Sequence, residues 1–450
     1  MVLPGDRSFD AARTVWNAMI DRRPAVIARC ADTADVAAAV RFAVAAGLEI
    51  GVHGGGHSVR GLCVPHGGLM IDLSTMGAVR VDSDRRRARV QGGALLSALD
   101  GATQRAGLAT TAGIVSHTGV GGLTLGGGMG WLARQFGLAC DNVESFELVT
   151  ADGTVLRADS SHNADLFWGL RGGGGNFGVV TQFEFRLHDV GTRALTVDLF
   201  YRPDDARQAL RRWRDVAVGA PRRATLTAAV GTTELRSAPP SLRGRGNVVS
   251  LGYVWVGDPD EGRHLLTELR GPTRPVAERV RELTYVALQS AEDDVQRHGL
   301  RRYRKGYYLR ELSDDALDAF VSRGAGPDTA DGDVLPNGTL QLYGGGITDV
   351  GDDETAFSHR SALVELVVSA SWAEPAADDA HLAAARRYGA TVAPFASGVF
   401  NDLPDDRADG AGRVHDAAKL ARLVALKDHY DPDNVFHRNH NIRPSAPGRA

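Results

Sequence analysis

Apolar runs and their spacing divide the chain into elements before any residue-specific chemistry is considered. In the first part of the chain, short apolar runs predict strands at 24–28, 49–53 and 69–73. Between the first two, the alanine- and valine-rich stretch 34–46 predicts a helix with Thr33 as its N-cap and Gly47 at its end. The second strand ends at His53 and is followed directly by a loop.

The elements that follow are antiparallel in character. Alternating residues at 78–83 and 87–91 flank a charged turn and predict a hairpin, and 95–106 reads as an amphipathic helix. The remaining elements expected in this part are strands at 144–150 and 154–158 with a turn at 152–153, a short helix that opens at Asp165, and a strand at 179–185.

From about residue 193 the pattern changes to longer apolar runs, which predict strands at 250–256, 339–343 and 363–369. Arginines recur between Arg207 and Arg214 on an expected helix, and their acidic neighbours favour a solvated face over an anion site. A loop is expected over 324–338. Near the end, a helix at 412–428 precedes the polar tail 434–442, which is unusual for a core segment.

Glycines gather in three clusters, at 54–56, 113–130 and 171–178. Glycine permits torsions closed to other residues and leaves backbone N–H groups uncovered, which suits a phosphate bridge. A nicotinamide-binding Rossmann motif is disfavoured because the first cluster leads into more loop and a strand rather than a helix. A P-loop is excluded because the first lysine of the chain is Lys305. Tight structural turns remain an alternative for any single cluster.

Composition excludes only a few classes of protein. The 450 residues suggest two domains, and a net charge of −4 gives no electrostatic case for nucleic acid or an anionic membrane. Cys30, Cys63 and Cys140 cannot pair evenly and lack metal-ligand spacing, so neither a disulfide framework nor a metal site is expected. The first 20 residues lack an apolar signal core, and no run approaches membrane-spanning length. A cytoplasmic protein is therefore expected.

The glycine clusters and their flanks resemble the FAD-binding domain of the berberine-bridge-enzyme-like oxidases. This family belongs to the vanillyl-alcohol-oxidase, or PCMH-type, superfamily, and the likeness is greatest to the bacterial branch that contains 6-hydroxynicotine oxidases. The matching segments are His53-Gly-Gly-Gly-His57-Ser58, Ile71-Asp-Leu-Ser74, 119–130, 137–143, 149–153, 165–168, 171–181, and in the tail 430–434 and 439–442.

The resemblance implies an α+β fold with a two-part FAD-binding domain over 1–192 (core about 24–190). It further implies a substrate-binding domain over 193–400, an antiparallel sheet flanked by helices, and a segment 401–450 that returns to the first domain. FAD is the implied cofactor, with His57 bonded to the flavin 8α-methyl group. The implied cofactor-binding positions are His53, Gly54, Gly55, Gly56, His57, Ser58, Gly61, Leu62, Cys63, Val115, Thr118, Gly119, Val120, Gly121, Gly122, Gly128, Val179, Asn401, Asn439 and Asn441.

The chain departs from the family pattern at two positions. Many relatives carry a cysteine that bonds to flavin C6 where this chain has Val115, so a single covalent link through His57 is expected. Cys140 belongs to another motif and is expected to be a small buried residue. Relatives also often have Tyr-x-Asn near the substrate, and alignment on Asn401 puts Val399 at the tyrosine. The usual base is therefore absent or supplied elsewhere.

Candidates for that base are Tyr307, Tyr308 and Tyr343 in the substrate half and His437 in the tail. The neighbouring Lys305 is expected to lower a phenol pKa in the pair Tyr307-Tyr308. Thr118 stands where the family controls oxygen access, and its valine-like shape favours O₂ as acceptor.

The leading function is an FAD-dependent oxidase that removes a hydride next to an alcohol or amine of a small metabolite, with H₂O₂ as product. The alternatives are a dehydrogenase with another acceptor, and a flavin-binding protein that catalyses a non-redox cyclisation. The expected partners are a small substrate and O₂, with no nucleic acid and no membrane. A monomer or homodimer is expected.

Overall fold

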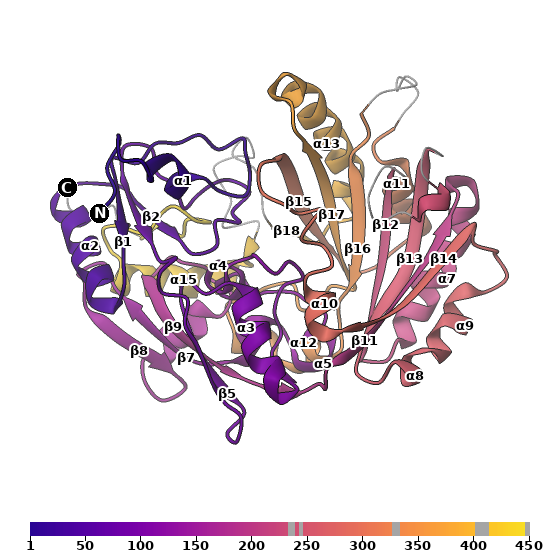
Figure 1. Cartoon of the computed structure of the whole chain (residues 1–450), viewed down its shortest axis with the longest axis horizontal. Coiled ribbons are helices and arrows are strands. Elements are labelled where there is room, and N and C mark those ends of the chain that lie inside the picture. The colour runs from indigo at the N-terminus through magenta and orange to yellow at the C-terminus, as the bar shows by residue number, and fades with distance from the viewer. Residues whose placement is uncertain (233–238, 243–245, 326–333, 401–413, 446–450) are drawn as a thin grey trace.

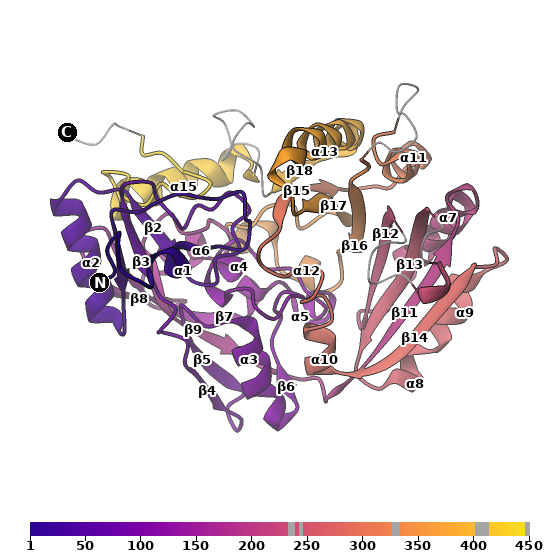
Figure 2. The same cartoon turned by 45° about the horizontal axis from the view of Figure 1, so that its top comes forward.

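The chain forms two parts that lie side by side in the computed structural model, which describes residues 1–450 except 233–238, 243–245, 326–333, 401–413 and 446–450 (Figure 1). In Figure 1, the elements before about residue 190 lie mostly on the left, and those from about residue 193 to 400 lie mostly on the right. The N-terminus and the last described residues, drawn in yellow, lie on the left-hand part, which is also clear after rotation (Figure 2). We call these the N-terminal part and the central part.

A small parallel sheet opens the N-terminal part after α1 (Phe9–Arg13). Its strands β1 (Val26–Arg29), β2 (Ile50–His53) and β3 (Leu69–Asp72) take the order β1-β3-β2, and α2 (Thr33–Ala45) joins the first two. These elements lie close to their predicted positions. The predicted cap is wrong by one residue, because the Asp32 side chain accepts the Asp35 N–H. Aspartate is the stronger cap of the two residue types.

The second sheet of this part is antiparallel and contains both predicted strand pairs. Its five strands take the order β4-β5-β9-β7-β8, with β4 (Val79–Asp82), β5 (Arg87–Gln91), β7 (Val143–Val149), β8 (Val155–Asp159) and β9 (Val179–Arg186). The other elements are α3 (Leu96–Thr103), β6 (Leu108–Ala109), α4 (Val120–Leu125), α5 (Ala133–Phe136), α6 (Ala164–Leu170) and β10 (His188–Asp189). Phe146, Phe183 and Phe185 fill the core against these helices.

The central part is built on one antiparallel sheet of eight strands, in the order β14-β11-β13-β12-β16-β17-β15-β18. The three strands predicted here correspond to β13, β16 and β17. The strands are β11 (Arg193–Tyr201), β12 (Ala224–Thr232), β13 (Asn247–Val256), β14 (Ala277–Thr284), β15 (Arg301–Leu309), β16 (Asn337–Leu342), β17 (Val364–Trp372) and β18 (Gly398–Phe400).

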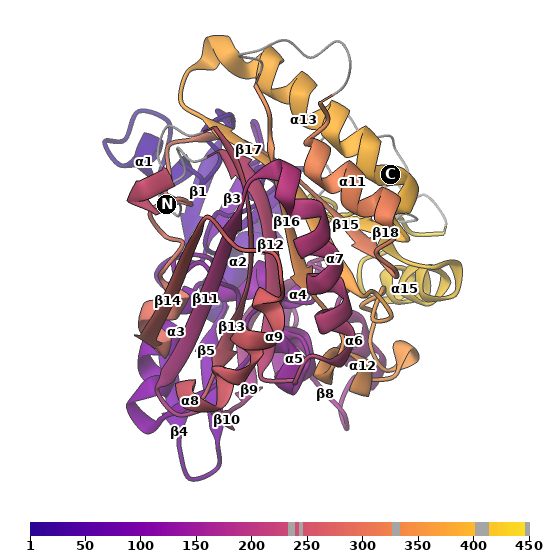
Figure 3. The ribbon, with the colours of Figure 1, turned by 90° about the vertical axis from the view of Figure 1, so that its right-hand side faces the viewer.

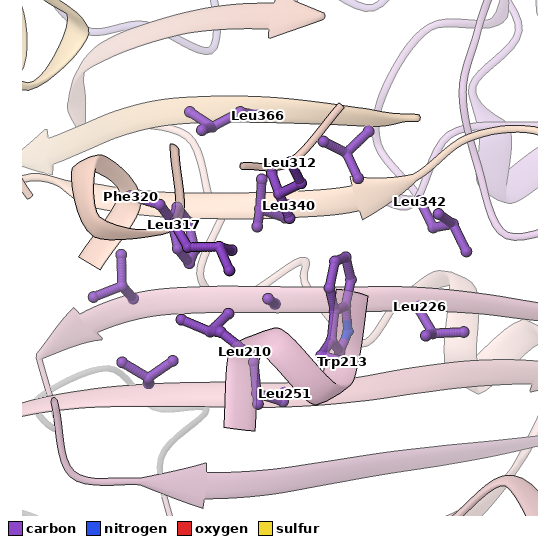
Figure 4. Close-up of a cluster of buried hydrophobic side chains, with 14 of the residues drawn as sticks. Leu210, Trp213, Leu226, Leu251, Leu312, Leu317, Phe320, Leu340, Leu342 and Leu366 are labelled. Carbon is purple, nitrogen blue, oxygen red and sulfur yellow. The ribbon is translucent and has the colours of Figure 1, made fainter. Parts of the chain in front are cut away.

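Helices cover one face of this sheet. In Figure 3, α7 (Pro203–Gly219), α11 (Asp314–Ser322) and α13 (Asp378–Val392) lie in front of the strands, with the N-terminal part behind. Leucines of β12, β13, β16 and β17 interdigitate with Leu210, Trp213 and Phe320 of these helices (Figure 4). As predicted, the arginines of α7 are solvated: Arg207 pairs with Asp318 at an exposed site. The remaining helices are α8 (Pro259–Gly262), α9 (His264–Arg270), α10 (Tyr285–Gln289) and α12 (Gly346–Asp349).

Side chains alternate between the two faces of a sheet. The face of the eight-stranded sheet that these helices leave uncovered turns toward the N-terminal part. Tyr308 and Tyr343 pack there against Leu138 and Cys140 of that part. The buried ion pair of Arg360 with Asp141, 2.6 Å apart, also joins the two parts. The site described below lies between these parts, so residues distant in sequence line it together.

The C-terminal segment returns to the N-terminal part. Helix α15 (Ala417–Tyr430) places Leu423 and Leu426 in the same core as the five-stranded sheet, and Ile442 is buried there too. Residues 412–413, where this helix was predicted to begin, lie outside the described residues. Among the helices that the structure describes, none combines the length and apolar character needed to cross a membrane.

Candidate functional site

The first two glycine clusters touch each other. A Cβ added at Gly55 would lie 2.2 Å from the Gly119 nitrogen, and one added at Gly119 would lie 2.4 Å from the Gly55 nitrogen. A Cβ added at Gly121 would lie 3.0 Å from the Gly92 carbonyl oxygen. Side chains are therefore excluded where the two loops meet, and only bare backbone can form this contact. One continuous backbone surface results, as a cradle for a phosphate bridge requires.

His57 follows the first loop and is surrounded by aromatic rings. Its Nε2 lies 2.7 Å from Nδ1 of His117, and its Nδ1 lies 3.3 Å from the Thr118 hydroxyl. Trp16 stacks on the imidazole with ring centroids 5.0 Å apart. His298, from the central part, completes the cluster. The cluster fixes the ring plane and leaves both nitrogens beside polar partners.

The surroundings of His57 favour its neutral form. Burial, followed by the nearby His117 and His298, lowers the pKa of His57 to about 3. Burial and the same neighbourhood lower the pKa of His298 as well. A neutral imidazole keeps a lone pair on one ring nitrogen. At neutral pH, the partly buried His57 ring is therefore uncharged.

Asp72 anchors the strand end that leads into the first loop. It is buried at the end of β3, and His53 Nδ1 lies 3.4 Å from its carboxylate. Burial raises the pKa of Asp72, but the contacts from His53 and from Ser74 outweigh burial and bring the pKa from 3.8 to about 2. A carboxylate with a lowered pKa stabilises the fold above the unfolded-state value of 3.8.

We expect Asp72→Asn to lower the free energy of unfolding by about 2 kcal/mol at pH 7. The stabilisation by ionised Asp72 is lost as pH falls through about 2, so the difference between the proteins should already be about half as large at pH 3. Urea unfolding of both proteins at pH 7, 4 and 3 measures it. A difference that grows toward low pH would contradict this origin.

The other predicted loop residues lie around the two clusters. The Ser58 hydroxyl accepts the Leu62 N–H at 3.3 Å, and Gly61, with φ +59, packs on Ile20. Gly56 and Gly128 have positive φ angles, +67 and +85, and Gly54 adjoins the Gly92 carbonyl. The Val115 carbonyl accepts the Thr118 N–H, and Val120 and Gly122 lie in the first turn of α4. Cys63 and Val179 are core residues. Cys30, Cys63 and Cys140 are buried free thiols, and Cys140 is fully buried as expected.

The tail packs against the third glycine cluster. Asn439 donates to the Gly175 carbonyl at 3.1 Å, and the Ile442 N–H donates to Asn176 at 3.0 Å. A fully buried ion pair between Lys427 and Asp431, 2.6 Å apart, lies at the end of α15, just before this tail. Asn401, also predicted to bind the cofactor, lies outside the described residues.

Unsatisfied polar atoms test whether FAD suits this region. The side-chain oxygens of Asn439 and Asn441, and Nε2 of His117, are buried without a hydrogen-bond partner among the described residues. Such atoms are costly unless another molecule pairs with them. The glycine cradle, the neutral His57 and these three atoms fit a large polar ligand with a phosphate bridge. The residues present therefore suit FAD.

The structure separates Tyr307, Tyr343 and His437, three of the four candidate acid–base residues. Tyr343 lies on the sheet face toward the N-terminal part, where its hydroxyl is 3.4 Å from Glu365. Tyr307 points to the opposite face, into the helix-covered core, and a Cβ at Gly389 would lie 2.6 Å from its hydroxyl. His437 contacts Glu49 at 2.9 Å in the N-terminal part. Only Tyr343 of the three thus faces the space between the parts.

The expectation of a lowered phenol pKa is wrong for Tyr308. Burial, followed by the nearby Glu365 carboxylate, raises the pKa of Tyr308, and burial also raises that of Tyr343. Lys305 and Tyr308 alternate onto opposite faces of β15, so the ammonium cannot act on that phenol as expected; it lies over the Tyr307 ring instead.

Sequence reasoning missed two charged residues on the inner face of the sheet. Glu365 is buried on β17, and burial raises its pKa. Arg304 acts on both Glu365 and His57, since its charge lowers the pKa of each. Glu365 and His57 therefore both lie within electrostatic reach of the Arg304 guanidinium. A glutamate within the apolar run 363–369 was a signal available in the sequence, whereas His298 and Trp16 gave none.

Comparisons with known proteins agree with this geometry. A family described as "FAD binding domain" matches residues 24–159, and one described as "Berberine and berberine like" matches 417–443. The chain is 31% identical to (R)-6-hydroxynicotine oxidase of Paenarthrobacter nicotinovorans, over 99% of this chain and 97% of that protein.

Two solved structures extend the comparison. The structure of 6-hydroxy-D-nicotine oxidase from Arthrobacter nicotinovorans superposes with a TM-score of 0.85 at 27% identity, over 99% of this chain and 97% of that one. Glucooligosaccharide oxidase from Acremonium strictum, described with a 6-S-cysteinyl, 8α-N1-histidyl FAD, has the same fold. Its TM-score is 0.85 at 24% identity, over 98% and 96% of the two chains.

Proposed function

Because the chain belongs to the berberine-bridge-enzyme-like family of FAD-linked oxidoreductases, we propose that it is an oxidase of a small alcohol or amine that uses FAD held between its two parts. The observation that carries the proposal is the pair of touching glycine loops with a neutral, half-buried His57 at their end. FAD supplies the two-electron chemistry, and the protein binds and orients it. The 54–58 and 118–122 loops would hold the pyrophosphate of FAD, and the unpaired oxygens of Asn439 and Asn441 would accept hydrogen bonds from the cofactor.

His57 is the single covalent tether of this FAD. The support is its nucleophilic neutral ring and the valine at position 115, whose side chain cannot form a thioether. Acid precipitation of the purified protein tests the tether directly, since covalent flavin stays yellow in the pellet. A colourless pellet would refute it.

Glu365, with the Tyr343 hydroxyl beside it, accepts the substrate proton while a hydride leaves the neighbouring carbon. The support is a buried carboxyl with a raised pKa beside Tyr343, on the sheet face toward the N-terminal part, since a base poised nearer neutrality is the more effective catalyst. Arg304, whose charge acts on both Glu365 and His57, orients a polar group of the substrate.

We expect Glu365→Gln to lower kcat by about 100-fold or more, because a positioned base contributes at least this much. Tyr343→Phe should lower kcat by about tenfold, since it removes one hydrogen bond to that carboxyl. Tyr307→Phe, on the far face of the same sheet, is the matched control and should change kcat little. Stopped-flow reduction of the flavin by substrate measures all three. Equal losses in Tyr343→Phe and Tyr307→Phe would point to folding rather than chemistry.

O₂ is the electron acceptor; the support is Thr118, which has about the shape of a valine and stands where the family resemblance implies control of oxygen access. We expect the reduced enzyme to reoxidise in air at least about tenfold faster than free reduced flavin, with H₂O₂ as product. Stopped-flow mixing of the reduced enzyme with aerated buffer measures this. Reoxidation no faster than that of free flavin would favour a dehydrogenase with another acceptor.

Anaerobic mixing with a panel of small alcohols, amines and oligosaccharides tests the function as a whole. Loss of the oxidised flavin absorbance with one class of compound supports an oxidase and names its substrate class. Bleaching by none of them, together with a flavin that dithionite reduces readily, would favour the non-redox alternative.

A further inference from the structure

Two histidines beside His57 have no part in the proposed oxidation. His117 Nδ1 lies 2.7 Å from His57 Nε2, and His298 stands next to both rings. One ring nitrogen from each of the three lies within 4.8 Å of the others. His57 and His117 are partly buried, whereas His298 is exposed. A row of imidazoles therefore runs from the proposed tether to solvent.

The protein holds this row in place from the central part. The Asp293 carboxylate accepts both the N–H and the hydroxyl of Ser116, at 2.8 and 2.6 Å, which fixes the residue before His117. Trp16, stacked on His57, donates its indole N–H to the Gln296 carbonyl at 2.5 Å. The segment 293–298 thus positions His57, His117 and His298 together. Such support is expected around groups that must meet within hydrogen-bond distance.

Attaching a histidine to FAD requires a proton acceptor. The imidazole N–H and one C–H of the flavin 8α-methyl group are replaced by an N–C bond. The two electrons released reduce the flavin and two protons balance them, and O₂ then takes both electrons and protons as H₂O₂. As its N–C bond forms, the imidazole becomes cationic and must lose its other N–H proton.

We propose that His117 is the base for this attachment, accepting the Nε2 proton of His57 while His57 Nδ1 bonds to the flavin, and that His298 passes the proton to solvent. The inference rests on the proposed tether at His57. Nε2 already faces His117, whereas Nδ1 has only the longer contact with the Thr118 hydroxyl, so Nδ1 is the free nucleophile.

Attachment kinetics test the role of His117. Full-length protein produced without flavin is mixed with FAD in air, and acid-stable flavin fluorescence is followed on denaturing gels. We expect His117→Ala to slow attachment by about 100-fold or more, and added imidazole to restore much of the rate. His298→Ala should slow it by about tenfold. His162→Ala, at an exposed position far along the chain, should match the wild type.

The readouts separate this role from a structural one. The melting temperature of His117→Ala should stay near wild type, since the ring makes few contacts besides those with His57 and His298. Attachment rates are compared at saturating FAD, so that a weaker non-covalent affinity from the lost Nε2 atom does not enter them. Attachment at the wild-type rate, a slow rate that imidazole leaves unchanged, or a flavin bonded to Nε2 in the isolated peptide would each overturn the role of His117. Wild-type protein without acid-stable flavin would overturn the tether itself, and the role of His117 with it.

Discussion

His57→Ala protein should bind FAD and lose all of it on acid precipitation. The glycine loops, Asn439 and Asn441 remain in the variant, so the non-covalent cradle is intact. The ring bond is expected to raise the flavin potential by withdrawing electron density, and its loss should lower kcat by about tenfold, equivalent to about 1.4 kcal/mol. Flavin content before and after acid, the midpoint potential and the rate of flavin reduction by substrate measure the three effects.

A matched variant separates the covalent bond from the imidazole itself. His53→Ala removes the other histidine of the same loop, which contacts Asp72 and the backbone of Gly56. It should lower stability and still retain acid-stable flavin. Acid-stable flavin in His57→Ala protein would place the attachment at another residue. An unchanged potential in His57→Ala protein would mean that the bond only anchors the cofactor.

Much of the N-terminal part could be predicted because its signals are local. Gly47 ends a helix, and the turn at 152–153 joins two strands, because each needs a backbone conformation that glycine adopts readily. The contact of Gly55 with Gly119 is different. It joins residues 64 positions apart, so only the resemblance, and no local pattern, indicated that the two loops form one surface.

The residues that meet where the central part packs against the N-terminal part could not be predicted in the same way. Tyr307 and Tyr308 are adjacent in sequence, yet a strand sends them to opposite faces, and only the sheet register decides which one faces the N-terminal part. Trp16 and His298 meet around His57 through packing between parts. The error over Tyr308 has the same origin, because burial sets its pKa and burial depends on tertiary structure.

Lys427→Met should destabilise the protein by about 3–5 kcal/mol, the usual cost of leaving one buried charge without its partner. The Lys427 ammonium donates to Asp431 at 2.6 Å and to the carbonyls of Asn176 and Phe436 at 2.8 and 2.9 Å. Asp431 in turn accepts the N–H groups of Val435 and Phe436. Removing the ammonium therefore releases the tail from the third glycine cluster and buries an unpaired carboxylate.

The loss should extend to cofactor binding, because Asn439 and Asn441 follow this turn. Urea unfolding measures the stability change, and FAD titration of the His57→Ala background, in which no covalent bond intervenes, measures the affinity. The control is Arg207→Met, which breaks the exposed pair with Asp318 and should cost less than about 1 kcal/mol. The double variant Lys427→Met/Asp431→Asn should recover part of the stability, since it no longer buries a lone charge. Equal costs for Lys427→Met and Arg207→Met would mean that the tail is held by its apolar contacts, with Leu423, Leu426 and Ile442 sufficient to keep it in place.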